Sequence, residues 1–198
     1  MSLSSKLSCW FNKTKFSFWI VYAISRLLSF LYILRTKRTG TVAPHFLLRD
    51  VERTLDRLVW NEDKFVVLGL AFKHFWMRNA EEIQWYLDNG ILPQTDCDEF
   101  ATYAAKALEG VDEALSPRVL TVRWVNADGV VEGHNVAIYS YPIQNGMRMY
   151  GHIGNWGHKR GFNSVAQIVN DIARTMESTP ISYAITTPGL KLIAHEKL

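Results

Sequence analysis

Cys97 is the residue in this sequence best suited to nucleophilic chemistry, because it lies in the first turn of a segment whose apolar residues recur at helical spacing. We expect a helix over residues 95–109, with Thr95 as its N-cap and Asp98 three positions later, as in a capping box. The positive end of the helix dipole and its unpaired N–H groups favour a thiolate and can hold an oxyanion. Asp96 and Asp98 are expected to act as caps, and their charges oppose the dipole by raising the pKa of the thiol.

A cysteine nucleophile also needs a base that accepts its proton and a third group that orients the base. His134 opens the apolar run HNVAIYSY and is the expected base. If residues 145–146 form a two-residue turn, Asn155 lies on the same side of the sheet as His134, and His152 lies on the opposite side. A wider turn reverses this parity, so both residues stay candidates for the third group.

The elements that must position these residues follow from the hydrophobic periodicity. We expect helices over residues 50–60, 62–78, 80–88, 95–109 and 163–176. After residue 110 the period changes to two, and we expect strands over residues 118–125, 130–141, 147–155, 181–187 and 190–194. Helices followed by a meander of strands indicate an α+β fold, in which helices pack on an antiparallel sheet.

The N-terminal 40 residues differ from the rest of the chain. They carry seven of the 22 basic residues and no acidic residue, which leaves 15 basic and 19 acidic residues in 41–198. The apolar run from Phe16 to Leu34 would be about 28 Å long as a helix, close to the thickness of a bilayer core, although Arg26 lies in its middle. We expect a membrane span, a helix lying in the membrane interface, or a helix docked on the domain or on a partner. The expected organisation is therefore an arm over 1–40, and one domain over 41–198.

Composition excludes several classes of protein. Hydrophobic residues make up 48% of the chain and charged residues 21%, as in a globular domain. Two cysteines, Cys9 and Cys97, are too few for a disulfide scaffold or a Cys-rich zinc site, and a site from Cys97, His134 and His152 lacks close ligand spacing. The mildly acidic domain gives no support for nucleic-acid binding. We therefore expect no metal and no organic cofactor. A free thiol suits the cytoplasmic side, where the N-terminal helix would associate the domain with a membrane.

Three motifs carry a resemblance to a known family. The segment QTDCDEFATYAAKAL resembles the D-C-(D/E)-(D/E)-(F/Y)-A motif of transglutaminase-like cysteine peptidases, in the papain-like superfamily. EGHNVAIY resembles their G-H-x-V strand, and GNWG resembles the strand that carries their third residue. Two positions differ: Thr95 stands where many members have Gly, and Asn155 where many have Asp. The resemblance implies a papain-like or transglutaminase-like core with Cys97 as nucleophile, His134 as base and Asn155 as orienting residue. It also implies an oxyanion hole from the Cys97 N–H and a nearby donor, taken as Gln94.

The expected activity is thiol-dependent acyl transfer on an amide of a protein or peptide, with Trp156 packed over the triad. Hydrolysis is favoured over transamidation because the domain is small. A cell-wall cysteine amidase is an alternative, and it would use His152 as third residue. A catalytically silent binding domain of the same fold, or a small membrane-anchored adaptor, are the alternatives outside enzymes.

Overall fold

The computed structural model describes residues 40–42, 47–61, 64–67, 70–73, 78–143 and 146–198, together with Leu27 and Leu31. The apolar run from Phe16 to Leu34 lies outside the described residues, apart from those two leucines. Within the described part, no helix is long and apolar enough to span a bilayer.

The helices of the described part are α3 (Leu48–Leu55), α4 (Ala80–Asp88), α5 (Cys97–Glu109), the short 3-10 helix η1 (Glu113–Leu115) and α6 (Val165–Thr175). The strands of the described part are β1 (Val59–Trp60), β2 (Lys64–Val67), β3 (Leu70–Lys73), β4 (Gln94–Thr95), β5 (Arg118–Val125), β6 (Val131–Pro142), β7 (Arg148–Gly154), β8 (Gly157–Phe162), β9 (Pro180–Thr186) and β10 (Leu192–Lys197).

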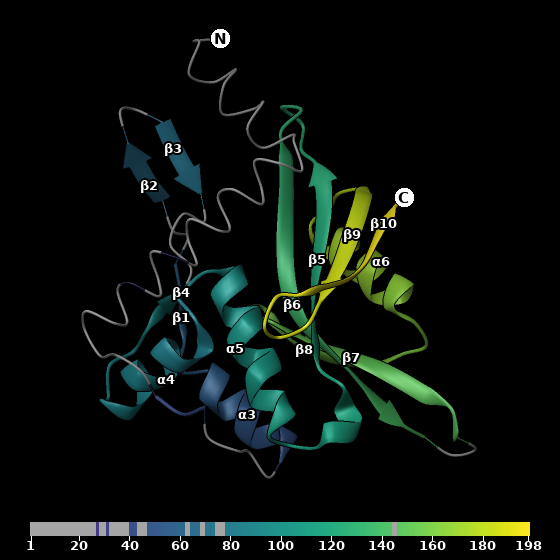
Figure 1. Ribbon diagram of the computed structural model, residues 1–198. Helices are drawn as coiled ribbons and strands as arrows, with labels where there is room; N and C mark the ends of the chain where they lie inside the picture. Colours follow the sequence, from purple (N-terminus) through teal and green to yellow (C-terminus); the bar gives the residue numbers. More distant parts are fainter. Residues whose placement is uncertain are drawn as a thin grey trace.

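Within the described residues, six strands form one sheet in the spatial order β10-β9-β5-β6-β7-β8, and every neighbouring pair is antiparallel. The helix α5 lies against one face of this sheet together with α3 and α4, and α6 packs on the other face (Figure 1). The expectation of an α+β fold with helices on an antiparallel sheet is confirmed.

Two hydrophobic clusters hold these layers together. On the α5 face, Tyr103 and Leu108 of the helix are buried against Val119, Ala137 and Tyr139 of the sheet. Each large apolar side chain buried in this way contributes about 1.5–3 kcal/mol to stability. The second cluster joins α6 to the opposite sheet face through Leu120, Val122, Trp124, Val136, Ile138, Ile168, Val169 and Ile172.

Two expected helices near the start of the domain differ from the structure. The helix expected over 50–60 ends at Leu55, and β1 follows it and pairs in parallel with β4. The helix expected over 62–78 is wrong, since β2 and β3 form an antiparallel hairpin with Val67 opposite Leu70. The segment KFVV contains aromatic and β-branched residues, which prefer extended backbone.

The register between β6 and β7 also differs from the one expected for a two-residue turn. Pro142 pairs with Arg148, and the Ile143 N–H donates to the Met147 carbonyl at 2.8 Å, so the connection is wider. Every pairing shifts by one residue, and His152 lies opposite Ile138. The strand β8 was not expected at all, and its hairpin with β7 ends that strand at Gly154, so Asn155 lies outside it.

Candidate functional site

The first turn of α5 fixes the position of Cys97. The Asp96 carboxylate is the N-cap, and its Oδ1 atom accepts the backbone N–H groups of Asp98 at 3.0 Å and Glu99 at 3.1 Å. This arrangement satisfies two of the N–H groups that the start of a helix leaves open. The expected cap, Thr95, belongs to β4 instead, so the helix begins two residues later than predicted, with Cys97 as its first residue.

The Cys97 thiol lies in a buried and negatively charged environment. The residue is 8% exposed, and its Sγ atom donates a hydrogen bond to Asp98 Oδ1 at 3.5 Å. Burial raises the pKa of Cys97 well above its ordinary value, Asp98 and Asp96 raise it further, and a hydrogen bond from the Asn135 backbone N–H lowers it. The expectation that these acids oppose the helix dipole is confirmed. The thiol is therefore protonated at neutral pH in this arrangement.

Side chains of β6 alternate between the two faces of the sheet beside the thiol. The side-chain amide of Asn135 donates to Asp98 of α5, so Asn135 faces that helix. His134 is the preceding residue and pairs with Val122, which belongs with Val136 to the cluster under α6. The register therefore directs the imidazole to the α6 side of the sheet.

The thiol meets β6 at an edge rather than on a face. Pairing between β6 and β7 ends, within the described residues, at Ala137 and Ile153, so β7 does not cover the strand beside Asn135. The Asn135 N–H is directed at Cys97 from this edge. The structure thus brings Cys97 to the residue that follows His134. The hydrogen bonds of Sγ within the described part go to Asp98 and Asn135, not to the imidazole.

The tight turn between β7 and β8 supplies the partner of His134. The imidazole is 6% exposed and stacks on the Trp156 indole, with ring centroids 3.7 Å apart and planes 22° from parallel. Gly154 allows this turn to approach β6, because a Cβ atom there would lie 3.0 Å from Val136 Cγ1. Gly157 follows with a φ of 136°, a conformation that side chains other than glycine rarely adopt.

Asn155 lies in the same turn, directly before Trp156. Its Oδ1 atom is buried and accepts no hydrogen bond from any described residue. A buried carbonyl without a donor is unfavourable by about 1–3 kcal/mol, so a group that supplies an N–H there would stabilise the site. Asn155 also lines a hollow of about 230 Å³ beside Phe100, which stands one turn after Cys97 in α5.

His152 is held in a separate buried cluster. It is fully buried, its Nε2 atom lies 3.4 Å from Asp171 Oδ2 of α6, and it pairs with Ile138. The Asp171 carboxylate also accepts hydrogen bonds from two basic side chains. Lys159 Nζ donates to Oδ2 at 2.8 Å, and Arg174 Nη2 donates to Oδ1 at 2.6 Å. The position of Ile138 is four residues along β6 from His134, or about 13 Å at the rise of a strand. The structure therefore does not bring His152 to Cys97. Among the described residues, no three side chains are grouped as metal ligands.

Gln94, expected to complete an oxyanion hole, is exposed in β4. Its Oε1 atom accepts a hydrogen bond from the Asn61 side chain at 2.8 Å, and its backbone carbonyl accepts one from Arg78 at 2.6 Å. Among the hydrogen bonds of the described residues, none joins Gln94 to Cys97.

Two supporting residues were missed by sequence reasoning. Asn135 supplies both a side-chain amide to Asp98 and a backbone N–H to the thiol, and the only signal for it was its place after the candidate base. Arg78 forms an ion pair with the fully buried Glu99 of α5 at 3.0 Å and also binds β4. No pattern around Arg78 in the sequence indicates this role.

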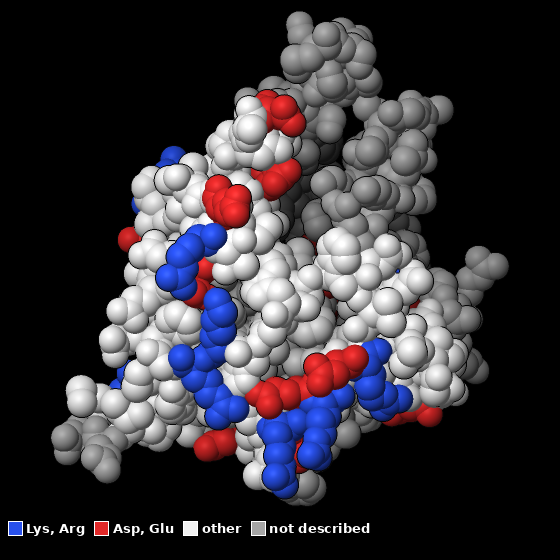
Figure 2. Space-filling view, turned by 180° about the vertical axis from the view of Figure 1, so that it is seen from behind, with Lys and Arg blue, Asp and Glu red and all other residues white. Residues whose placement is uncertain are grey.

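On the face shown in Figure 2, acidic and basic side chains lie beside one another along the lower edge. Ion pairs such as Lys159 with Asp171 and Arg160 with Glu52 place opposite charges side by side.

No protein-family model matches the chain, and no curated protein gives a significant match. The likeness to transglutaminase-like cysteine peptidases therefore rests on the three sequence motifs alone.

Proposed function

We propose that this protein catalyses thiol-dependent acyl transfer on amide bonds, with hydrolysis of a protein or peptide amide as the outcome. Cys97 is the nucleophile, His134 the base and Asn155 the orienting residue, on a core of the papain-like, transglutaminase-like type. The observation that carries the proposal is the meeting of α5 with β6, where the helix N-terminus holds Cys97 against the residue next to His134. The turn that stacks on His134 carries a buried amide oxygen with no donor among the described residues.

The raised pKa of Cys97 decides how the proton must move. Because burial and two carboxylates keep the thiol neutral, attack by Sγ on the carbonyl carbon requires His134 to accept the proton in the same step. The imidazolium then donates that proton to the leaving amine, and an acyl-thioester remains on Cys97. Water, deprotonated by His134, attacks the thioester and releases a carboxylic acid and the thiol. Asn155 Oδ1 accepts the second imidazole N–H and holds the ring in the required tautomer.

This chemistry requires the imidazole to leave Trp156 and meet the thiol at the open edge of β6. Catalytic hydrogen bonds are often long or misaligned in unliganded enzymes and tighten only when substrate binds. The site needs no metal and no organic cofactor. A free thiol nucleophile is compatible with the cytoplasmic side of a membrane, to which the residues from Phe16 to Leu34 would attach the domain.

The test is the rate of Cys97 alkylation by iodoacetamide as a function of pH, followed by peptide mass spectrometry. If His134 is the base, deprotonation of the imidazole adds an inflection to the profile, and His134→Ala removes that inflection. The alkylation rate of Cys9 in the same molecule is the internal control for the reactivity of iodoacetamide at each pH. Because substrate is needed to draw the imidazole to the thiol, the profile is recorded with and without a peptide library. A profile that is the same in the parent and in His134→Ala under both conditions contradicts the proposal.

A second measurement separates hydrolysis from transamidation. Peptide libraries are incubated with the protein in water enriched in oxygen-18, and Cys97→Ala is the control. Hydrolysis places the heavy oxygen in a new carboxyl group, whereas transamidation joins an added amine and incorporates none.

A catalytically silent binding domain is the second candidate, and the buried, protonated thiol favours it. In that case Cys97 reacts more slowly than Cys9 at every pH, and His134→Ala leaves its rate unchanged.

A further inference from the structure

A hollow of about 230 Å³ lies between α3, β1, the first turns of α5 and the turn joining β7 to β8. It adjoins the candidate site, because Asn155 lines it and Phe100 stands one turn along α5 from Cys97. Sites for drug-sized ligands enclose roughly 300–1,000 Å³, so this hollow suits a single amino-acid side chain.

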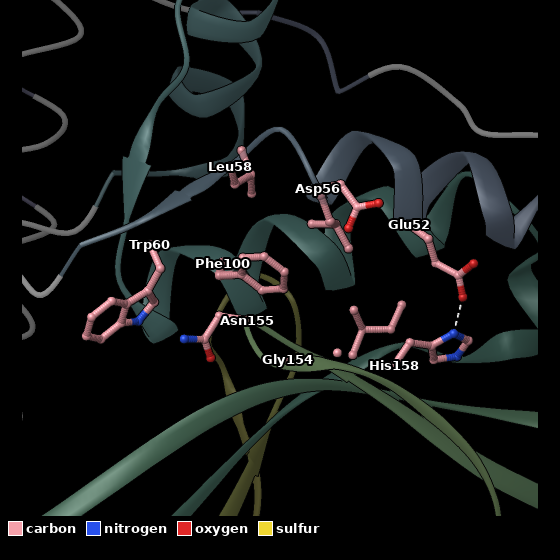
Figure 3. Close-up of a pocket in the computed structure, with 11 residues that line it drawn as sticks. Glu52, Asp56, Leu58, Trp60, Phe100, Gly154, Asn155 and His158 are labelled. Carbon is pink, nitrogen blue, oxygen red and sulfur yellow. Dashed lines mark ion pairs between the residues drawn. The ribbon is translucent and has the colours of Figure 1, made fainter.

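The walls of the hollow are apolar. Leu55, Leu58, Phe100 and Ile153 line it, and all four are buried members of the core beneath it. The Trp60 indole stands at the rim and is 56% exposed. In Figure 3, Trp60 and Asn155 lie toward one end of the hollow, while Asp56 and Glu52 lie toward the other.

The two carboxylates at the far end differ in their partners. Glu52 is bound by His158 and lies 3.3 Å from the Arg160 guanidinium. The Asp56 side chain forms no ion pair and no hydrogen bond with any described residue. Asp56 is also the C-cap of α3, where the negative end of the helix dipole disfavours an acidic residue. The hollow therefore carries one exposed carboxylate that forms no ion pair with a described group.

We propose that this hollow binds the basic side chain, lysine or arginine, of a peptide. The methylene groups of such a side chain pack on the apolar walls, and its cationic head reaches Asp56. The apolar wall residues suit the methylene groups of the side chain, and the Asp56 carboxylate suits its cationic group. If the proposed function holds, the peptide is the substrate, and the hollow selects a basic residue next to the amide that Cys97 attacks.

The test uses the full-length protein and three model compounds, the N-acetyl methylamides of lysine, norleucine and glutamate. Norleucine keeps the stem of lysine without its charge. Binding is followed by NMR from the indole N–H signal of Trp60, which Trp60→Phe identifies. We expect lysine to bind about fivefold more tightly than norleucine, the upper range for an exposed ion pair, and glutamate to bind most weakly.

Charge reversal gives the sharper result. Asp56→Lys should invert the order of affinities, so that the glutamate compound binds more tightly than the lysine compound. The control is Asp128→Lys, which makes an equal charge change on the exposed β5–β6 turn and should leave the order of affinities as in the parent protein. Lysine at the end of α3 suits the helix dipole, so this variant is expected to fold, and circular dichroism checks it. Equal affinities for lysine and norleucine, or an order unchanged by Asp56→Lys, would overturn the inference.

The binding assay does not depend on turnover, so the two proposals fail separately. A lysine preference that Asp56→Lys inverts, together with an unreactive Cys97, leaves a peptide-binding hollow on a silent domain. A reactive Cys97 without that preference keeps the acyl-transfer proposal and removes the basic side chain from it.

Discussion

Replacing Asp98 with Asn should make Cys97 more reactive near neutral pH. The Asp98 carboxylate lies 3.5 Å from Sγ and raises the pKa of the thiol, both by its charge and by accepting a hydrogen bond from the S–H group. At that separation, the repulsion between a thiolate and a carboxylate is about 1 kcal/mol in water and about 5 kcal/mol at an effective dielectric constant of 20. Asn keeps an oxygen that can accept the Asn135 amide hydrogen bond but carries no charge.

This energy converts into a rate. Each 1.36 kcal/mol is about a tenfold change in thiolate fraction, so Asp98→Asn raises that fraction about eightfold at the lower limit and about three-thousandfold at the upper. A thiolate of lower pKa is also a weaker nucleophile, with a Brønsted coefficient of about 0.4–0.5, which removes nearly half of the gain on a logarithmic scale. The expected acceleration in disulfide exchange is therefore between about threefold and about eightyfold.

The assay is the absorbance change on reaction with 4,4′-dithiodipyridine, in a Cys9→Ser background, from pH 6 upward. Asp98→Asn should move the midpoint of the pH–rate profile to lower pH, which a change in access to the thiol would not do. Asp96→Asn should act in the same direction by a smaller amount, and Asp128→Asn should have no effect. An unchanged midpoint in Asp98→Asn would refute the view that this carboxylate keeps the thiol protonated.

Three further predictions concern stability. Gly151→Ala places a Cβ atom 2.5 Å from the buried Tyr139 ring and should reduce the free energy of unfolding in urea by about 1–3 kcal/mol, while Gly189→Ala, with 3.7 Å of room, should not. Burial raises the pKa of Asp171, but hydrogen bonds from Lys159 and Arg174 lower it, and the pKa lies below its ordinary value. Its stabilisation is therefore lost as pH falls below about 4, and Asp171→Asn should unfold with a weaker acid dependence. Burial lowers the pKa of His152, so stability falls as pH drops below about 6.5, and thermal melts of His152→Gln should show less of that loss.

The elements with strong periodicity were predictable from the sequence. The strand β5 has the expected bounds, and α5 differs by only two residues at its start. That difference arises because Thr95 and Asp96 are both suitable N-caps, and only the three-dimensional fold selects the carboxylate that reaches two N–H groups.

The failures have physical causes as well. The strand β8 has the sequence GHKRGF, whose glycines and basic residues are poor strand formers, and it forms only because β7 offers an open edge. The side on which Asn155 lies could not be derived, because the wide turn after Pro142 shifts the register by one and the next turn takes Asn155 out of the strand. Periodicity predicted most of the elements that carry the candidate residues, but turn geometry decides which of those residues meet.

The chemistry of Cys97 depends on β6 more than on its own helix. A helix N-terminus stabilises a negative charge by about 0.3–1 kcal/mol, and by about 2 kcal/mol in favourable partly buried geometries. The repulsion from Asp98 alone is comparable or larger, and burial and Asp96 add to it, so the dipole cannot ionise this thiol. If Cys97 is the nucleophile, as we propose, a base must therefore remove its proton during the reaction, and His134 is the imidazole one residue from the strand position that contacts Sγ. In that mechanism, the acids around Cys97 keep the thiol unreactive until a substrate draws His134 from Trp156 to the edge of β6.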